Sequence, residues 1–342
     1  MQTPKDLGFY FPAEWHKHVS TWLSYPHNEN SFPDKIHTVF PYYNLFIKEI
    51  SKGEIVNINV LNTEMQHKVE MELNVLNIDM KQIRFHLFKT DDAWCRDHGP
   101  AFVIKDNEKA IVDWNYNAWG NKYPYYNDNL IPLKIAEYLN LKTFKPNIVM
   151  EGGSVDFNGK GSVLTTTACL LNKNRNPQLN QGQIEKKLAQ YYGIDNIIWL
   201  KDGIVGDDTD GHVDDIARFV ATDIIITVIE ENKSDDNYVV LQNNLSILSK
   251  SRLENGKQPT IVTLPMPEPV IWDGQRLPAS YANFYISNAA VIVPVYRCKQ
   301  DNKAIYTLEE CFKDRKIVAI DSTEIIWGLG SFHCLSQQEP DL

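Results

Sequence analysis

One pattern recurs along the chain and constrains its fold more than any other: two short strands joined by a tight polar turn. The turns carry Asp106-Asn107, Asn158-Gly159, Asp223 and Asn288, residue types that favour hairpins. We predict four such pairs, at residues 101–104 with 110–114, 154–157 with 162–166, 218–222 with 224–229, and 284–287 with 290–295. Their spacing of roughly 50–65 residues is typical of propeller-like arrays.

A helix and a further strand are predicted after each hairpin. Amphipathic helices are expected near residues 130–139, 183–192, 238–250 and 307–314, and short apolar strands at 147–150, 196–200, 260–264 and 316–320. Each unit therefore combines strands and a helix, which indicates an α/β fold.

A fifth unit is predicted to be split between the two ends of the chain. Residues 331–337 would pair with 18–25, followed by helices near 36–52 and 64–76 and by strands at 54–61 and 83–88. Such a closure ties the termini together and removes exposed sheet edges. We therefore expect one closed domain over residues 1–342 rather than two domains.

Composition excludes several partners. The net charge of −10 and the isoelectric point of about 5.4 argue against nucleic acid and anionic membranes, because both need a basic face, and they suit a cationic ligand. Five widely spread cysteines fit neither a disulfide framework nor a metal site, so a reducing cytoplasm is expected. Neither a signal peptide nor an apolar stretch approaching the ~18 residues of a membrane span is apparent.

Polar residues that could carry chemistry fall at corresponding places in these units. They are Asp97 before the first hairpin, Glu151 before the second, His212 and Asp214 before the third, and Cys334 in the split unit. If the repeats surround an axis, residues at equivalent positions converge at one end of it. The scattered residues then form one candidate site.

Each of these residues also has a simpler interpretation. Asp97 could cap the turn before Gly99-Pro100, and the glycines after Glu151 are common in turns. If residues 212–214 are extended, His212 and Asp214 share a face, but the same acidic segment could be a solvated loop. Calcium is disfavoured because the spacer and closing glutamate of an EF-hand are absent, and zinc because no HExxH or paired Cys/His spacing occurs.

Cys334 is the candidate nucleophile. It is a lone thiol in the glycine-interrupted segment 328–334, and the neighbouring His333 invites a Cys-His dyad. Cys95 is a competing thiol, although a small buried hydrophobe is the commoner fate of such a cysteine. The three other cysteines are interpreted as core or surface residues: Cys169, Cys298 and Cys311.

Taken together, the motifs resemble the agmatine deiminase family, part of the wider family that includes bacterial peptidylarginine deiminase within the guanidine-modifying pentein superfamily. The resemblance runs in order from about residue 8 to 340. It is carried by the segments at 11–15 (FPAEW), 94–100 (WCRDHGP), 119–120 (WG), 151–153 (EGG), 174–177 (NRNP), 208–214 (DTDGHVD), 276–281 (RLPASY) and 333–338 (HCLSQQ). It implies a five-bladed pseudosymmetric α/β propeller.

The resemblance also implies a reaction. Carboxylates are natural partners of a planar guanidinium, and by similarity Asp97 and Asp214 would hold it. Cys334 would attack its central carbon, His212 would move protons, and Glu151 would fix the imidazole. His333 would then have a structural role rather than a catalytic one. No cofactor or metal is required, and the resemblance suggests at least a homodimer.

Substrate choice depends on an outer shell around this site. The distal ammonium of agmatine favours acidic or aromatic groups, and the candidates are Asp208, Asp210, Trp94 and, at the mouth, Trp119. A deiminase of free or peptidyl arginine and an idle guanidinium or polyamine binder stay open as alternatives.

The chain departs from the family pattern at three positions. Leu329 and Ser331 stand in the loop that aims Cys334, where family members usually carry glycine and asparagine, and His98 stands where a small hydroxylated residue is frequent. The first two departures bear on turnover and on substrate fit. His98 is expected to be accommodated, because the residues around it keep the pattern.

Overall fold

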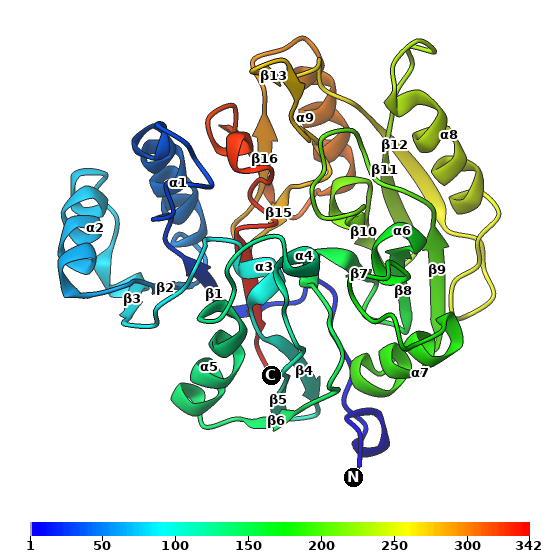
Figure 1. Cartoon of the computed structure of the whole chain (residues 1–342), viewed down its shortest axis with the longest axis horizontal. Coiled ribbons are helices and arrows are strands. Elements are labelled where there is room, and N and C mark those ends of the chain that lie inside the picture. The colour runs from blue at the N-terminus through cyan, green and yellow to red at the C-terminus, as the bar shows by residue number, and fades with distance from the viewer. Residues whose placement is uncertain (1) are drawn as a thin grey trace.

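Small mixed β-sheets and the helices that connect their strands build the computed structural model, which describes residues 2–342 (Figure 1). The predicted α/β class is confirmed. In Figure 1 the sheets lie around the middle of the molecule, and the longer helices lie outside them.

Four of the sheets share one topology, in which an antiparallel hairpin is extended by a parallel third strand. Their strands are β4 (Ala101–Lys105), β5 (Glu108–Val112) and β6 (Lys142–Phe144); β7 (Val155–Phe157), β8 (Ser162–Thr166) and β9 (Asn196–Leu200); β10 (Ala217–Ala221), β11 (Ile224–Ile229) and β12 (Thr260–Pro265); and β15 (Tyr285–Ile286), β16 (Ala290–Val295) and β17 (Lys316–Asp321). All four predicted hairpins are confirmed.

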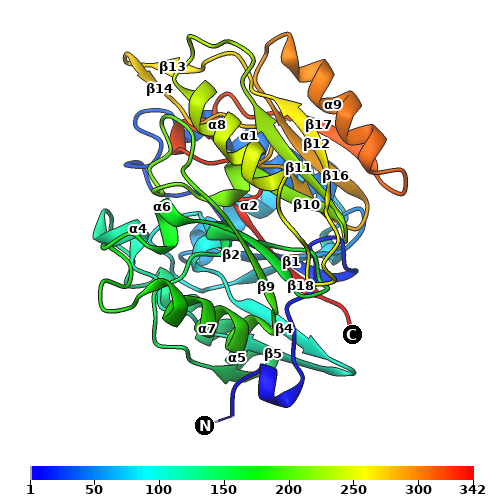
Figure 2. The ribbon, with the colours of Figure 1, turned by 90° about the vertical axis from the view of Figure 1, so that its right-hand side faces the viewer.

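The parallel step in each sheet requires a crossover, and a helix supplies it. These helices are α5 (Ile131–Leu139), α7 (Gln181–Tyr192), α8 (Asn237–Leu248) and α9 (Gln300–Cys311). Helix α7 shows how the sequence fixes one: Asn180 and Gln183 form a capping box at its start, and Gly193 ends it in the left-handed conformation. Figure 2 shows α7 and α8 in front of the strands that they connect.

The split unit is confirmed. Strand β18 (Ser336–Pro340) pairs antiparallel with β1 (His18–Ser24), and β2 (Ile55–Asn59) and β3 (Ile83–His86) follow in parallel. Helices α1 (Ile36–Ile50) and α2 (Thr63–Val75) make the crossovers. The C-terminal strand begins at residue 336 rather than 331, so residues 331–335 form the turn that carries Cys334.

Three further boundaries differ from prediction. The strand expected at 147–150 is reduced to an isolated parallel bridge between Val149 and Asn115, and the third strand of this sheet is the earlier β6. Pro146 lacks a ladder donor and Asn147 has a positive φ of 58°, which separates the bridge from β6. Helix α9 starts seven residues before the predicted 307. The segment after His212 is a 3₁₀ turn (Val213–Asp215) instead of an extended strand.

Smaller elements complete the structure around the site. They are the four-residue helices α3 (Cys95–His98), α4 (Ala118–Asn121) and α6 (Thr167–Leu170), and the hairpin of β13 (Ile271–Trp272) with β14 (Gln275–Arg276). No helix in residues 2–342 is long and apolar enough to cross a bilayer.

Candidate active site

Each of the five units contributes polar side chains from the segment that precedes its first strand. These side chains are Asp97 before β4, Glu151 before β7, His212 and Asp214 before β10, Asn283 before β15, and Cys334 before β18. All of them are buried. The repeat therefore brings together the five residues that the sequence singled out, together with one that it did not.

Gly153 marks the point where three of these residues meet. A methyl group on its α-carbon would lie 2.6 Å from His212 Nδ1, 2.8 Å from Asp97 Oδ1 and 3.0 Å from Asp214 Oδ2. Only a residue without a side chain leaves room for all three groups at this place.

Cys334 lies in a polar, buried setting. Asn283 Nδ2 donates a hydrogen bond to its Sγ at 3.0 Å, and Asp214 Oδ2 lies 3.6 Å from the same sulfur. Burial, and then the charges of Asp214, Asp215 and Asp97, raise the pKa of the thiol well above its usual value. The thiol is therefore protonated until a cation enters and offsets the carboxylates.

His333, the neighbour of Cys334, does not form a dyad with it. Its Nδ1 lies 2.6 Å from Asp214 Oδ2, and its Nε2 lies 2.8 Å from Glu14 Oε2. Burial alone would raise the pKa of Asp214, but the hydrogen bond and charge of His333 outweigh it and lower that pKa. Asp214 is thus kept ionised, as a site for a cation requires.

His212 lies between two carboxylates. Its Nδ1 is 3.7 Å from Asp97 Oδ1 and its Nε2 is 3.7 Å from Glu151 Oε2, and among residues 2–342 neither nitrogen has a hydrogen-bond partner. Burial opposes the charged imidazolium, but Asp97, Cys169 and Glu151 raise the pKa of His212 well above its usual value. A protonated imidazole here can supply a proton to a leaving group.

Glu151 is held from two sides. Arg175 Nε donates to its Oε1 at 2.6 Å, and Cys169 Sγ lies 3.7 Å from its Oε2. Burial would raise the pKa of Glu151, but Arg175 and His212 lower it. Burial, and then the charge of Glu151, raise the pKa of the Cys169 thiol to about 11. Cys169 was interpreted from the sequence as core or surface; it is buried, and it lies against the proposed acid/base pair.

Asp97 is fixed by two donors. Gly153 N donates to its Oδ1 at 2.8 Å, and Trp119 Nε1 donates to its Oδ2 at 3.0 Å. Burial raises the pKa of Asp97, although the charge of His212 counteracts this. Asp97 thus has a donor on each oxygen, beyond the role of a simple turn cap.

A cavity of about 190 Å³, open to solvent at its mouth, reaches Cys334 and Asp97. Four tryptophans line it: Trp94, Trp119, Trp272 and Trp327. Aromatic walls around a carboxylate suit a cation that carries a hydrocarbon chain.

Acidic residues occur at different distances from this cavity. Asp208 lines it and accepts a hydrogen bond from Tyr123 Oη at 2.7 Å. Asp210 is not among the lining residues and pairs with Arg175 at 2.5 Å and with Lys122 at 3.2 Å. Asp92, which sequence reasoning missed, also lines the cavity, and burial raises its pKa to about 6.

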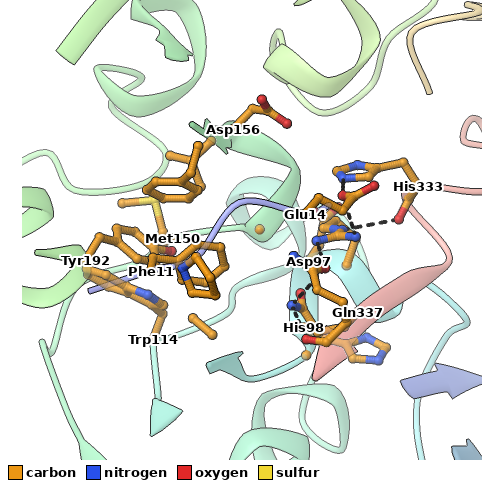
Figure 3. Close-up of a pocket in the computed structure, with 18 of the residues that line it drawn as sticks. Phe11, Glu14, Asp97, His98, Trp114, Met150, Asp156, Tyr192, His333 and Gln337 are labelled. Atoms are coloured by element: carbon orange, nitrogen blue, oxygen red, sulfur yellow. Dashed lines mark hydrogen bonds and ion pairs between the residues drawn. The ribbon is translucent and has the colours of Figure 1, made fainter. Parts of the chain in front are cut away.

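A second and much tighter cavity, of about 30 Å³, also has Asp97 in its lining (Figure 3). Figure 3 shows aromatic side chains, including Phe11 and Trp114, on one side of it, and Glu14 with His333 on the other. No cysteine is among its lining residues in the described chain. The cavity with Cys334 is therefore the candidate active site.

The structure also shows where the competing thiol Cys95 lies, and where the three residues that depart from the family pattern lie. Cys95 is buried against Trp22 and is not among the residues that line either cavity. Leu329 lines the active-site cavity with a positive φ of 71°, and Ser331 hydrogen-bonds Ser322 at 2.7 Å. His98 Nε2 lies 3.0 Å from the Ser24 hydroxyl.

Asn283 is the residue that sequence reasoning missed at the centre of the site. Besides its bond to Cys334 Sγ, it donates to Asp215 Oδ1 at 2.8 Å, and its Oδ1 accepts from His333 N at 3.1 Å. The signal was available, because Asn283 directly precedes the fourth predicted hairpin, at the place where the other units carry their polar residues.

Two clusters contain enough ligand types to hold a metal. One comprises Glu151, Cys169 and His212, and the other comprises Asp214, Asp215 and Cys334. Within each cluster, the ligand atoms lie within 4.8 Å of one another.

Comparisons with known proteins agree with this geometry. The family model described as Porphyromonas-type peptidyl-arginine deiminase matches residues 10–340. The agmatine deiminase of Stutzerimonas stutzeri is 34% identical over 99% of this chain and 97% of its own length.

Two solved structures of agmatine deiminases are also similar to this chain, in fold and in sequence. The structure of the agmatine deiminase of Enterococcus faecalis has a TM-score of 0.94 and 32% identity, covering 100% of this chain and 98% of that one. A variant of the C. jejuni agmatine deiminase with substrate bound has a TM-score of 0.89 and 33% identity, covering 97% and 96%.

Proposed function

Since the chain belongs to the Porphyromonas-type peptidyl-arginine deiminase family and is 34% identical to the agmatine deiminase of Stutzerimonas stutzeri, we propose that it hydrolyses agmatine to N-carbamoylputrescine and ammonia. It is an enzyme that acts on a guanidino C–N bond. The observation that carries the proposal is that Cys334 and Asp97 share the floor of one aromatic-walled cavity.

Binding comes first in the proposed mechanism. Asp97 and Asp214 accept hydrogen bonds from the N–H groups of the guanidinium, whose charge is offset by theirs. The bound cation also lies beside Cys334, where it counteracts the carboxylates that keep the thiol protonated. Substrate entry therefore activates the nucleophile.

As the cation binds, the Cys334 thiol loses its proton to solvent. The Sγ thiolate then attacks the guanidinium carbon and forms a C–S bond, while the C=N π electrons move to nitrogen, which gives a tetrahedral adduct. The adduct breaks one C–N bond as His212 donates a proton to the departing ammonia, which leaves a covalent thiouronium on Cys334. His212 next takes a proton from water, the water oxygen adds to the same carbon, and the C–S bond breaks. The ureido product leaves, and the thiol is regenerated.

Substrate selection is assigned to the outer part of the cavity. Asp92 and Asp208 offer carboxylates to the distal ammonium of agmatine, and Trp94 offers an aromatic face. Asp210 supports this shell indirectly, because Lys122 Nζ lies 3.2 Å from both Asp210 Oδ1 and Asp208 Oδ1. The carboxylate of arginine meets the same acidic groups, so its binding is disfavoured.

The proposal extends to the arrangement of the sheets, to the oligomeric state and to the cellular location. We propose that the five sheets form a five-bladed propeller in a single domain over residues 1–342, since the units repeat one topology and converge at one site. We further propose a cytoplasmic enzyme that assembles as a homodimer or larger oligomer, and neither a nucleic acid nor a membrane as partner.

The deciding experiment measures ureido product and ammonia from agmatine, free arginine and a peptide with a C-terminal arginine. We expect kcat/KM for agmatine to exceed the others by at least tenfold, because the cavity carries carboxylates at its outer end. Equal or greater activity on either arginine substrate would replace this proposal by an arginine deiminase. Binding of agmatine without ammonia release would indicate an idle member of the family.

A further inference from the structure

Three side chains from separate segments place a sulfur, a nitrogen and an oxygen around one point beside the active site. Cys169 Sγ and His212 Nε2 each lie 3.7 Å from Glu151 Oε2, and the three residues have ligand atoms within 4.8 Å of one another. Cys169 lies in helix α6, and the other two residues each precede a 3₁₀ turn. Spacing along the sequence gives no sign of this cluster.

The separations match the edges of a tetrahedral zinc site. With Zn–S near ~2.3 Å, Zn–N near ~2.0 Å and Zn–O near ~2.1 Å, ligand atoms at tetrahedral angles lie about 3.4 to 3.6 Å apart. The two measured edges of 3.7 Å exceed this by a few tenths of an ångström at most. Thiolate, imidazole and carboxylate are also the ligand types that zinc prefers.

A second observation points to a ligand here. Both ring nitrogens of His212 are fully buried and have no hydrogen-bond partner within residues 2–342. Buried polar atoms usually have partners, so an imidazole without one is available to a ligand. Arg175 binds the other oxygen of Glu151 at 2.6 Å, which is the outer-shell support that a ligating carboxylate receives in metal sites.

The other cluster is less suitable. Asn283 Nδ2 already donates to Cys334 Sγ at 3.0 Å and to Asp215 Oδ1 at 2.8 Å, and His333 Nδ1 lies 2.6 Å from Asp214 Oδ2. A metal there would have to displace partners of all three ligands. It would also be held by two carboxylates and one thiol, without an imidazole.

We propose that Glu151, Cys169 and His212 form a binding site for Zn²⁺ that inhibits the enzyme. The charges balance, because one carboxylate and one thiolate offset the two charges of the ion. The Cys169 thiol proton and the proton on His212 Nε2 both leave to solvent, since a metal binds the thiolate and the neutral imidazole. The inhibition rests on the proposed function: zinc on His212 Nε2 occupies the residue that donates a proton to ammonia. Metal binding itself does not depend on that function.

Cobalt(II) provides the test, since it replaces zinc and gives a near-ultraviolet charge-transfer absorption when a thiolate binds it. The full-length protein, Cys169→Ala, Cys169→Ser and Cys334→Ala are each titrated with Co²⁺, and Zn²⁺ is then added as a competitor. We expect the band in the unmodified protein and in Cys334→Ala, its loss in both Cys169 variants, and its displacement by zinc. Far-ultraviolet circular dichroism shows whether each variant is folded. If Cys169→Ala does not fold, Cys169→Ser still tests the site, because serine nearly preserves the shape of the side chain.

Several results would overturn the proposal. A band that survives in Cys169→Ser but disappears in Cys334→Ala would place the metal at the other cluster. Absence of any band at a cobalt excess would remove the site altogether. Zinc inhibition that is unchanged in Cys169→Ser, where we expect it to weaken roughly tenfold or more, would also contradict it. If the band behaves as expected but agmatine is not hydrolysed, the metal site stands and the proposed function fails.

Discussion

Replacing Gly153 by alanine perturbs the site with a single methyl group. The new carbon would lie 2.6 Å from His212 Nδ1, where an ordinary contact begins at 3.4 Å, so the imidazole must retreat by about 0.8 Å. Asp97 Oδ1 at 2.8 Å and Asp214 Oδ2 at 3.0 Å must also move. A misplacement of about 1 Å costs roughly 10²-fold in rate, or about 2.7 kcal/mol of activation free energy.

We therefore expect kcat of Gly153→Ala to fall about 10²-fold, and overpacking to cost about 1–3 kcal/mol of unfolding free energy. The assay combines initial rates of ureido product formation with urea unfolding followed by circular dichroism. Gly182→Ala is the matched control: its nearest neighbour would be Asn180 Oδ1 at 3.7 Å, and it lies in helix α7, so activity should be unchanged. A Gly153→Ala enzyme within threefold of the unmodified kcat would refute this account of the site.

Other predictions concern the nucleophile, the outer shell and the buried ion pair. Cys334→Ala should still bind agmatine in calorimetry but form neither a covalent adduct nor product; retained activity with labelling of Cys95 would contradict it. Because burial holds Asp92 protonated below about pH 6 and only its ionised form attracts an ammonium, kcat/KM for agmatine should rise with pH through that value. In Asp92→Asn this rise should be absent and KM about 10–100-fold higher, as initial rates between about pH 5 and pH 8 will show. Arg175→Met leaves Glu151 as an unpaired buried charge and should cost about 3–5 kcal/mol in urea unfolding; a loss below about 1 kcal/mol would argue against the pair.

Local patterns made much of the fold predictable. Turn residues and alternating apolar positions located the four hairpins, and the repeat located the split unit between β18 and β1. Prediction failed where single residues outweighed a pattern, as at the expected strand 147–150, where Pro146 and Asn147 interrupt the strand and leave only the bridge of Val149 to Asn115. It also placed the start of helix α9 too late, because polar residues in its first turns hide the helical period.

The sequence by itself determined the repeated α/β unit and the family, because both follow from short-range order and from motifs. It also singled out the candidate set Asp97, Glu151, His212, Asp214 and Cys334. Only the tertiary structure decided which atoms meet. It bonds Asn283 to the nucleophile and turns His333 toward Asp214 and Glu14. It also brings Cys169 against Glu151. The physical reason is that hydrogen bonds and pKa shifts depend on distances of a few ångströms between side chains from different units, and no spacing along the chain encodes those distances.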